Sequence, residues 1–185
     1  MERHPHRQDK VLILQDLTES FEPIVGQSVT LRTLRREDVD IEAAFLTGLS
    51  AESRHNRLLG GMIRITREYV EKLTTVDYTR DMALAAALML DGREVLIGVA
   101  RYVLEAEGRA CEFALVIADA WQGRGIGRRI LEKIIAVARN RGLERIYGDV
   151  LATNQPMLEF CRKLGFTLGR NPDDPTVTRV TLLLR

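Results

Sequence analysis

The sequence has few cysteines and no long apolar run. Only two of its 185 residues are cysteines, Cys111 and Cys161, and their spacing matches no metal-binding or redox motif. We expect both to be reduced, buried thiols of a cytoplasmic protein, because disulfides are rare in that compartment. The first ten residues lack the apolar segment of a signal peptide. No apolar run approaches the roughly 20 residues that span a bilayer, so we expect no membrane partner.

Net charge is almost absent as well. The 27 basic and 26 acidic residues leave a formal charge of +1. This balance argues against nucleic-acid binding, which normally requires a basic face. The length, with 45% hydrophobic and 29% charged residues, is typical of one soluble domain with a buried core.

The beginning of the chain differs from the rest. Residues 1–27 are expected to form an N-terminal arm that is partly disordered, because residues 1–10 are polar. An apolar run at residues 11–14 and a turn at residues 23–26 follow. We expect this second part of the arm to pack either on the domain or on a partner chain, which leaves a homodimer open.

The hydrophobic pattern of residues 28–185 predicts one α/β (α+β) domain. Its order is one strand, three helices, three strands, a helix, a strand, a helix and two strands. Asp91-Gly92 and similar short turns join the three consecutive strands, which implies an antiparallel meander. The seven strands are expected at residues 29–34, 82–90, 95–104, 110–117, 145–151, 166–168 and 177–184.

Helix caps mark the boundaries of the predicted helices. Ser50, Thr66 and Asn154 each precede a helical pattern and can accept a backbone N–H in the first turn. Gly142 and Gly165 follow helical patterns at the position where left-handed backbone ends a helix. The flanking helices therefore have clear beginnings and ends.

A glycine-rich segment joins the strand that ends at Ile117 to the next helix. It reads Gln122-Gly123-Arg124-Gly125-Ile126-Gly127 and continues with Arg128 and Arg129. The glycines let the backbone approach a ligand closely. Free N–H groups of the first helical turn, the helix dipole and the arginines add positive potential. The segment therefore predicts a site for an anionic group such as a pyrophosphate.

Two common phosphate-binding motifs do not fit this segment. A P-loop requires Gly-Lys-Ser/Thr, and the dinucleotide fingerprint requires a third glycine where the chain has Arg128. From the glycines alone, a tight connection without a ligand explains the segment equally well.

Together with two later motifs, the segment resembles the GCN5-related N-acetyltransferase (GNAT) superfamily. The motifs are Gln122-x-x-Gly125-x-Gly127 after a strand, then Asn154, then Leu164-Gly165-Phe166. Residues 49–54 (LSAESR), 98–102 (GVARY) and 112–114 (EFA) resemble more specifically the GNAT module of bacterial protein lysine acetyltransferases. The resemblance covers about residues 28–185 and implies an N-acetyltransferase domain: a mixed, mostly antiparallel sheet of about seven strands, flanked by helices, with a splayed cofactor cleft.

The resemblance implies acetyl-CoA as cosubstrate and no metal. The pantetheine arm would pair with one strand, the pyrophosphate would lie on the glycine-rich amides, and Asn154 would bond the pantetheine with Phe160 nearby. Asn154 is also a competent helix cap, and Phe160 is equally explained as a core residue. The implied cofactor-binding residues are Leu115, Val116, Ile117, Gln122, Gly123, Arg124, Gly125, Ile126, Gly127, Arg128, Asn154 and Phe160.

The same strand offers a general base. Strand alternation places Glu112, Ala114 and Val116 on one face. A carboxylate among apolar residues has a raised pKa and can accept a proton, and the resemblance implies that role for Glu112. An ion pair with Arg101 is the structural alternative. Many GNAT enzymes have a tyrosine seven residues after the asparagine as proton donor; here that position is Cys161, so either this thiol or solvent would act.

The expected function is acetyl transfer from acetyl-CoA to an amine by direct attack in a ternary complex. A protein lysine is the favoured acceptor. A small-molecule amine acceptor and a non-catalytic acyl-CoA-binding module are the alternatives. We expect Arg54, Arg57, Asp77 and Asp81 to line the acceptor side, because the corresponding region forms the acceptor wall in the family.

Overall fold

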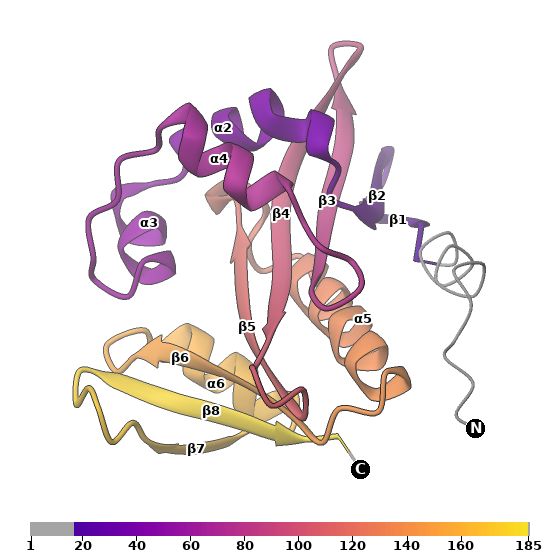
Figure 1. Ribbon diagram of the computed structural model, residues 1–185. Coiled ribbons are helices and arrows are strands. Elements are labelled where there is room, and N and C mark those ends of the chain that lie inside the picture. Colours follow the sequence, from indigo (N-terminus) through magenta and orange to yellow (C-terminus); the bar gives the residue numbers. More distant parts are fainter. Residues whose placement is uncertain (1–16, 185) are drawn as a thin grey trace, which may run out of the picture.

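In a computed structural model, residues 17–184 are described, and they form one sheet with helices on both faces (Figure 1). The apolar run at residues 11–14 lies outside these residues, and the arm boundary and the homodimer stay predictions. The strands are β1 (Glu19–Ile24), β2 (Gln27–Thr33), β3 (Met82–Leu90), β4 (Arg93–Leu104), β5 (Ala110–Ile117), β6 (Arg145–Leu151), β7 (Thr167–Arg170) and β8 (Val177–Leu183). The helices are α2 (Val39–Gly48), α3 (Ala51–Arg57), α4 (Arg67–Thr74), α5 (Ile126–Asn140) and α6 (Gln155–Lys163), with short 3₁₀ turns η1 (Arg36–Asp38) and η2 (Asp119–Trp121).

The sheet has eight strands in the order β1-β2-β3-β4-β5-β6-β8-β7. Every neighbouring pair is antiparallel except β5 and β6, which are parallel. The predicted class, a mixed and mostly antiparallel sheet, is confirmed, with one strand more than expected. The extra strand is β1, whose sequence ESFEPI is half exposed at the sheet edge and therefore lacks a clear apolar alternation.

The parallel pair β5–β6 is short, and this opens the sheet. Only three residues of each strand are paired, and the last pair joins Glu112 to Tyr147. Beyond it the two strands diverge (Figure 1). Where they part, Gly148 lies against Phe113, so closely that a Cβ on Gly148 would be 2.8 Å from Phe113 Cε1. The rest of β5 therefore has a backbone edge without a strand partner.

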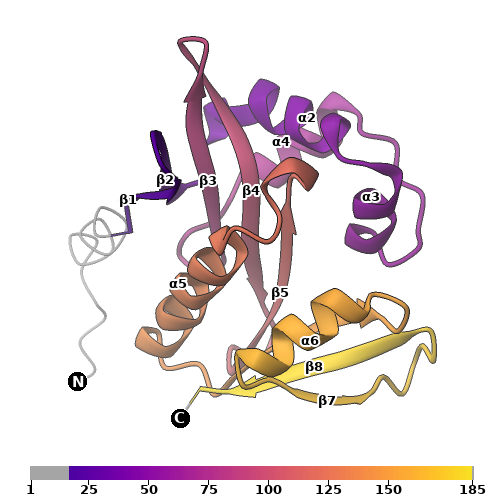
Figure 2. The same ribbon diagram turned by 180° about the vertical axis from the view of Figure 1, so that it is seen from behind.

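Helices bury both faces of the sheet. α5 lies on the face opposite to α2 and α4 (Figures 1 and 2), and its residues Ile126, Ile130, Ile134 and Ala138 are completely buried there. The four-residue spacing of these side chains explains why the segment is an amphipathic helix. On the other face, α2 and α4 pack on a second apolar cluster that includes Val116 of β5.

The predicted caps are all present. Ser50 Oγ accepts the N–H of Ser53 at 3.1 Å, Thr66 Oγ1 that of Tyr69 at 3.2 Å, and Asn154 Oδ1 that of Met157 at 3.2 Å. Gly142 and Gly165 have φ of +75° and +88°, as expected after helix ends. Within residues 17–184, no helix combines the length and hydropathy needed to cross a membrane.

Candidate active site

A cleft of about 540 Å³ lies where β5 and β6 part. Its walls come from β5, the glycine-rich loop, the beginning of α6 and the end of α3. Glu112 lines it, and so do ten of the twelve residues expected to bind the cofactor. Those ten are Leu115, Val116, Ile117, Gln122, Gly123, Gly125, Gly127, Arg128, Asn154 and Phe160.

The side chains of the other two residues lie elsewhere. Ile126 is completely buried in the core beneath α5. Arg124 Nε donates to the carbonyl of Ala120 at 3.0 Å, and its guanidinium lies 5.5 Å from the centre of the Trp121 ring. For Ile126 the expectation concerned the backbone amide, which still belongs to the loop. For Arg124 it also included the charge of the side chain, which lies against Trp121 and does not line the cleft.

The glycine-rich loop presents backbone donors to open space. The N–H groups of residues 125–128 bond to no acceptor within the described part of the chain. Gly123 and Gly125 have φ of +71° and +80°, and nothing lies within 4 Å of a Cβ built on either. Gln122 Nε2 holds the loop by donating to the carbonyl of Ile117 at 3.0 Å. Such a group of free amides at a helix beginning favours a bound anion.

Asp119, which the sequence analysis did not select, ties α3 to this loop. Its carboxylate accepts the backbone N–H of Ser50 at 2.9 Å and the hydroxyls of Ser50 and Ser53 at 2.6 and 2.8 Å. These hydrogen bonds, led by that from the Ser50 hydroxyl, lower the pKa of Asp119 to about 2. A single aspartate after a strand gives no sequence signal for contacts with residues almost 70 positions earlier.

We expect Asp119→Ala to lower the free energy of unfolding by about 1 kcal/mol near neutral pH. The effect is this small because solvent screens the interactions of an exposed carboxylate. Because the pKa is lowered in the folded state, the stabilisation exists above the ordinary aspartate pKa and disappears as pH falls toward about 2. Urea unfolding at neutral and acidic pH tests this. Equal stability of both proteins at neutral pH would contradict it.

Glu112 has a carboxylate without a partner in the cleft. Within residues 17–184 it makes no hydrogen bond and no ion pair, and the expected alternative partner, Arg101, instead contacts Glu42 at 3.5 Å. Glu112 is exposed to the cleft, but partial desolvation of its carboxylate raises its pKa, and nearby Asp149 raises it further, against the smaller opposing effects of Arg179 and Arg57. The site thus holds a carboxylate with raised proton affinity that can accept a proton.

Asp149, another of the four carboxylate residues that line the cleft, is already bonded. Asp149 accepts two hydrogen bonds from Arg179, at 2.9 and 2.8 Å, and one from Asn171 at 2.9 Å. Its side chain is 12% exposed. Asp149 therefore stabilises the β6–β8 pairing and is not free to act as a base, and the same holds for Asp119. Glu52 of α3 also lines the cleft without a partner among the described residues, but Glu112 lies on the cofactor strand itself.

The thiol of Cys161 does not face the cleft. The residue is completely buried in the core, and burial raises its pKa to about 12. Its expected role as a proton donor is therefore not supported by its position. The helix periodicity of α6 decides this, since Cys161 lies three residues after the buried Leu158, on the same inward side.

The chain matches a family model over residues 59–166. That model describes the acetyltransferase (GNAT) family. This chain belongs to the GNAT family.

Individual relatives agree with that membership. An acetyltransferase of Pseudomonas aeruginosa is 36% identical over 151 residues, which cover 82% of this chain and 81% of that protein. Acetyltransferase Pat of Mycolicibacterium smegmatis is 29% identical over 84% of this chain, but the match spans only 46% of the longer Pat.

Solved GNAT structures share the fold. The GNAT domain of S. lividans PAT has a TM-score of 0.78 and 27% identity, with 91% of this chain and 97% of that domain covered. Spermidine N-acetyltransferase of Vibrio cholerae, solved with CoA and spermine, has a TM-score of 0.69 at 18% identity, over 84% and 95% of the two chains. The latter similarity shows the fold alone.

GNAT enzymes use acetyl-CoA, and acetyl-CoA is the cosubstrate of this chain. The cleft fits it. Its volume lies in the range of about 300–1,000 Å³ that is usual for ligand pockets, the unpaired edge of β5 can bond an extended amide chain, and the loop amides can hold a phosphate.

Proposed function

We propose that this GNAT enzyme acts in the cytoplasm and acetylates a protein lysine by direct attack of the amine on the bound thioester. The observation that carries the catalytic part is the unpaired carboxylate of Glu112, at the last residue pair before β5 and β6 diverge. The protein-lysine part rests on the resemblance of residues 49–54, 98–102 and 112–114 to bacterial protein lysine acetyltransferases.

The chemistry requires a base because only a neutral amine can attack. At pH 7 about 1 lysine in 2,500 is neutral, which corresponds to about 4.6 kcal/mol. Acetyl-CoA supplies an activated acetyl group when it is bound. Glu112 accepts the ammonium proton directly or through a water molecule, and its raised pKa brings it closer to that of the amine.

The remaining cleft residues hold the cosubstrate in this proposal. Leu115 and the N–H of Ile117 contribute the backbone edge of β5 that has no strand partner, and the amides of residues 125–128 bind the pyrophosphate. Asn154 can cap α6 and bind the cosubstrate at the same time. Its Oδ1 accepts the N–H of Met157, while its NH₂ group has no acceptor within residues 17–184 and can donate to the cosubstrate. Phe160 packs half-buried beside Gly127, whose missing Cβ keeps the cleft open.

A small-molecule amine is the second candidate acceptor. Solved GNAT neighbours include the spermidine enzyme and a ribosomal L7/L12 α-N-acetyltransferase with CoA, so the fold does not select between acceptor types. The unpaired positive charge of Arg57 beside Glu112 supports a protein acceptor over a polycation.

The proposed function is tested by measuring CoA release from acetyl-CoA with a lysate proteome and with a panel of small amines in parallel. We expect amine-dependent CoA release and acetyl-lysine on lysate proteins. Turnover with small amines alone would reject the protein-lysine acceptor. Binding of acetyl-CoA without turnover on any amine would favour a non-catalytic acyl-CoA-binding module.

A further inference from the structure

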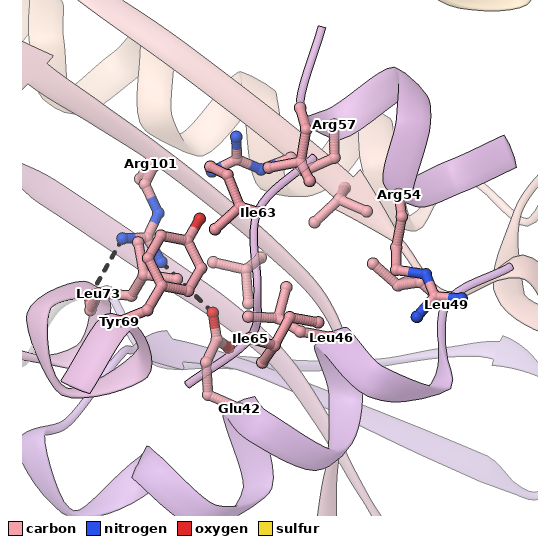
Figure 3. Close-up of a pocket in the computed structure, with 13 residues that line it drawn as sticks. Glu42, Leu46, Leu49, Arg54, Arg57, Ile63, Ile65, Tyr69, Leu73 and Arg101 are labelled. Atoms are coloured by element: carbon pink, nitrogen blue, oxygen red, sulfur yellow. Dashed lines mark hydrogen bonds and ion pairs between the residues drawn. The ribbon is translucent and has the colours of Figure 1, made fainter. Parts of the chain in front are cut away.

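A small chamber adjoins the cleft on the side of α2, α3 and α4 (Figure 3). It has a volume of about 30 Å³, which is room for about two water molecules. Arg57 and Val116 line both the chamber and the cleft, so the two spaces meet at these residues. Of the four residues expected on the acceptor side, Arg54 and Arg57 line the chamber. Asp77 and Asp81 line neither space, so that part of the expectation is wrong.

One arginine of the chamber already has its charge balanced. Arg101 is 14% exposed and contacts Glu42, which is 1% exposed, at 3.5 Å. Arg101 also donates to the carbonyl of Leu73 at 3.1 Å (Figure 3). The second oxygen of Glu42 has no partner among the described residues, and the chamber has space for a water molecule that would bond it. Glu42 and Arg101 therefore form a buried, internally compensated pair.

The two arginines of α3 have no such compensation. Arg54 and Arg57 are three residues apart, so they lie on the same face of the helix. Both are half-buried, and neither guanidinium has a hydrogen-bond acceptor or an ion-pair partner within residues 17–184. Partial burial of an unpaired charge is costly. Planar guanidinium groups suit carboxylates in particular, because they can donate two parallel hydrogen bonds.

The position of Arg57 relates it to the reaction centre. Desolvation raises the pKa of both Glu42 and Glu112, and the charge of Arg57 partly opposes both increases, although it contacts neither as an ion pair. An acceptor whose amine approaches Glu112 would therefore place neighbouring groups within reach of Arg57. A polycation such as spermine would meet the uncompensated positive charge of Arg57 there.

We propose that Arg57 binds a carboxylate of the acceptor, so that the preferred acceptor is a lysine with an aspartate or glutamate beside it in the protein. This inference rests on the proposed function and names its substrate class. The chamber itself is too small for a side chain, so the carboxylate lies at its mouth, where Arg57 reaches both spaces.

The test compares two peptides that differ only in charge. One has glutamate on both sides of a single lysine, and its twin has glutamine there. Binding of each peptide to the enzyme saturated with CoA is measured by calorimetry, and turnover is measured separately. We expect the acidic peptide to bind wild-type enzyme about tenfold more tightly than its twin, and Arg57→Gln to abolish that preference. Arg57→Lys should retain part of it, because the charge remains while the bidentate geometry is lost.

Arg64→Gln is the matched control. Arg64 is exposed in the loop between α3 and α4 and lines neither space, and its substitution removes the same charge as Arg57→Gln does. It should keep the full preference for the acidic peptide. Equal binding of both peptides to wild-type enzyme would overturn the inference. It would also be overturned if Arg57→Gln lost acetyl-CoA affinity but kept the peptide preference, because Arg57 would then bind a phosphate of the cofactor. If the charge preference is found in binding but neither peptide is acetylated, Arg57 is confirmed as a carboxylate site, and the proposed lysine acceptor fails.

Discussion

Glu112→Gln is expected to lower turnover about 100-fold, the usual contribution of a general base, while leaving acetyl-CoA affinity nearly unchanged. Glutamine has the size of glutamate but cannot accept the ammonium proton. Glu112 lies at the fork of β5 and β6 and bonds to nothing else within residues 17–184, so its replacement should not disturb the fold. Steady-state kinetics and calorimetric binding of acetyl-CoA measure the two effects.

The pH dependence of kcat/KM is an independent test of Glu112 as the general base. Partial desolvation raises the pKa of Glu112, so the active, deprotonated form increases as pH rises through a value above that of an ordinary glutamate. Wild-type kcat/KM should therefore increase with pH over that range, and the Glu112→Gln profile should lack this step. Glu107→Gln, the same change in the exposed β4–β5 turn, should behave as wild type. Unchanged turnover in Glu112→Gln would reject Glu112 as the base.

Gly148→Ala is expected to destabilise the fold by about 2–3 kcal/mol, as overpacking in a close-packed region does. A Cβ at this position would be 2.8 Å from Phe113 Cε1 and 3.0 Å from the Phe113 carbonyl oxygen. The ring cannot simply turn away, because it packs on Phe166 with 5.3 Å between ring centres. The backbone oxygen is fixed by the sheet. Relief requires β6 to move from β5 at the base of the cleft.

The displacement should also lower turnover, because the residue before Phe113 is Glu112. Urea unfolding gives the stability change, and kinetics on the folded protein gives the functional one. Gly169→Ala in β7 is the matched control, since nothing lies within 4 Å of a Cβ there and its φ is not positive. It should be neutral. If Gly148→Ala unfolds like the control, the close contact does not determine the separation of β5 and β6.

Most secondary structure could be predicted because it depends on neighbouring residues. The capping oxygens of Ser50, Thr66 and Asn154 act on N–H groups three residues away, and the four-residue apolar spacing of α5 needs no distant partner. β1 was missed because an edge strand with one half-exposed side has weak alternation.

The cofactor side of the site was similarly accessible to sequence reasoning. One continuous segment, from Phe113 to Arg128, contains the strand, the glycines and the free amides of the first helical turn. Its capacity to bind an anion can therefore be predicted from neighbouring residues. The alternation that places Glu112 and Val116 on one face is also local, and Val116 does lie in the cluster opposite to Phe113.

The acceptor side was decided by tertiary structure. Arg101, the alternative ion-pair partner considered for Glu112, pairs with Glu42, 59 positions earlier in the chain, because α2 packs over β4. Asp119 meets Ser50 across 69 positions, Cys161 points into the core, and Arg57 stands between two spaces lined by separate elements. The sequence determines, through local spacing and backbone chemistry, which side chains and free N–H groups each segment exposes. The packing of distant segments determines which charges pair with each other. That packing leaves Arg57 unpaired beside the cleft, where it can receive a substrate.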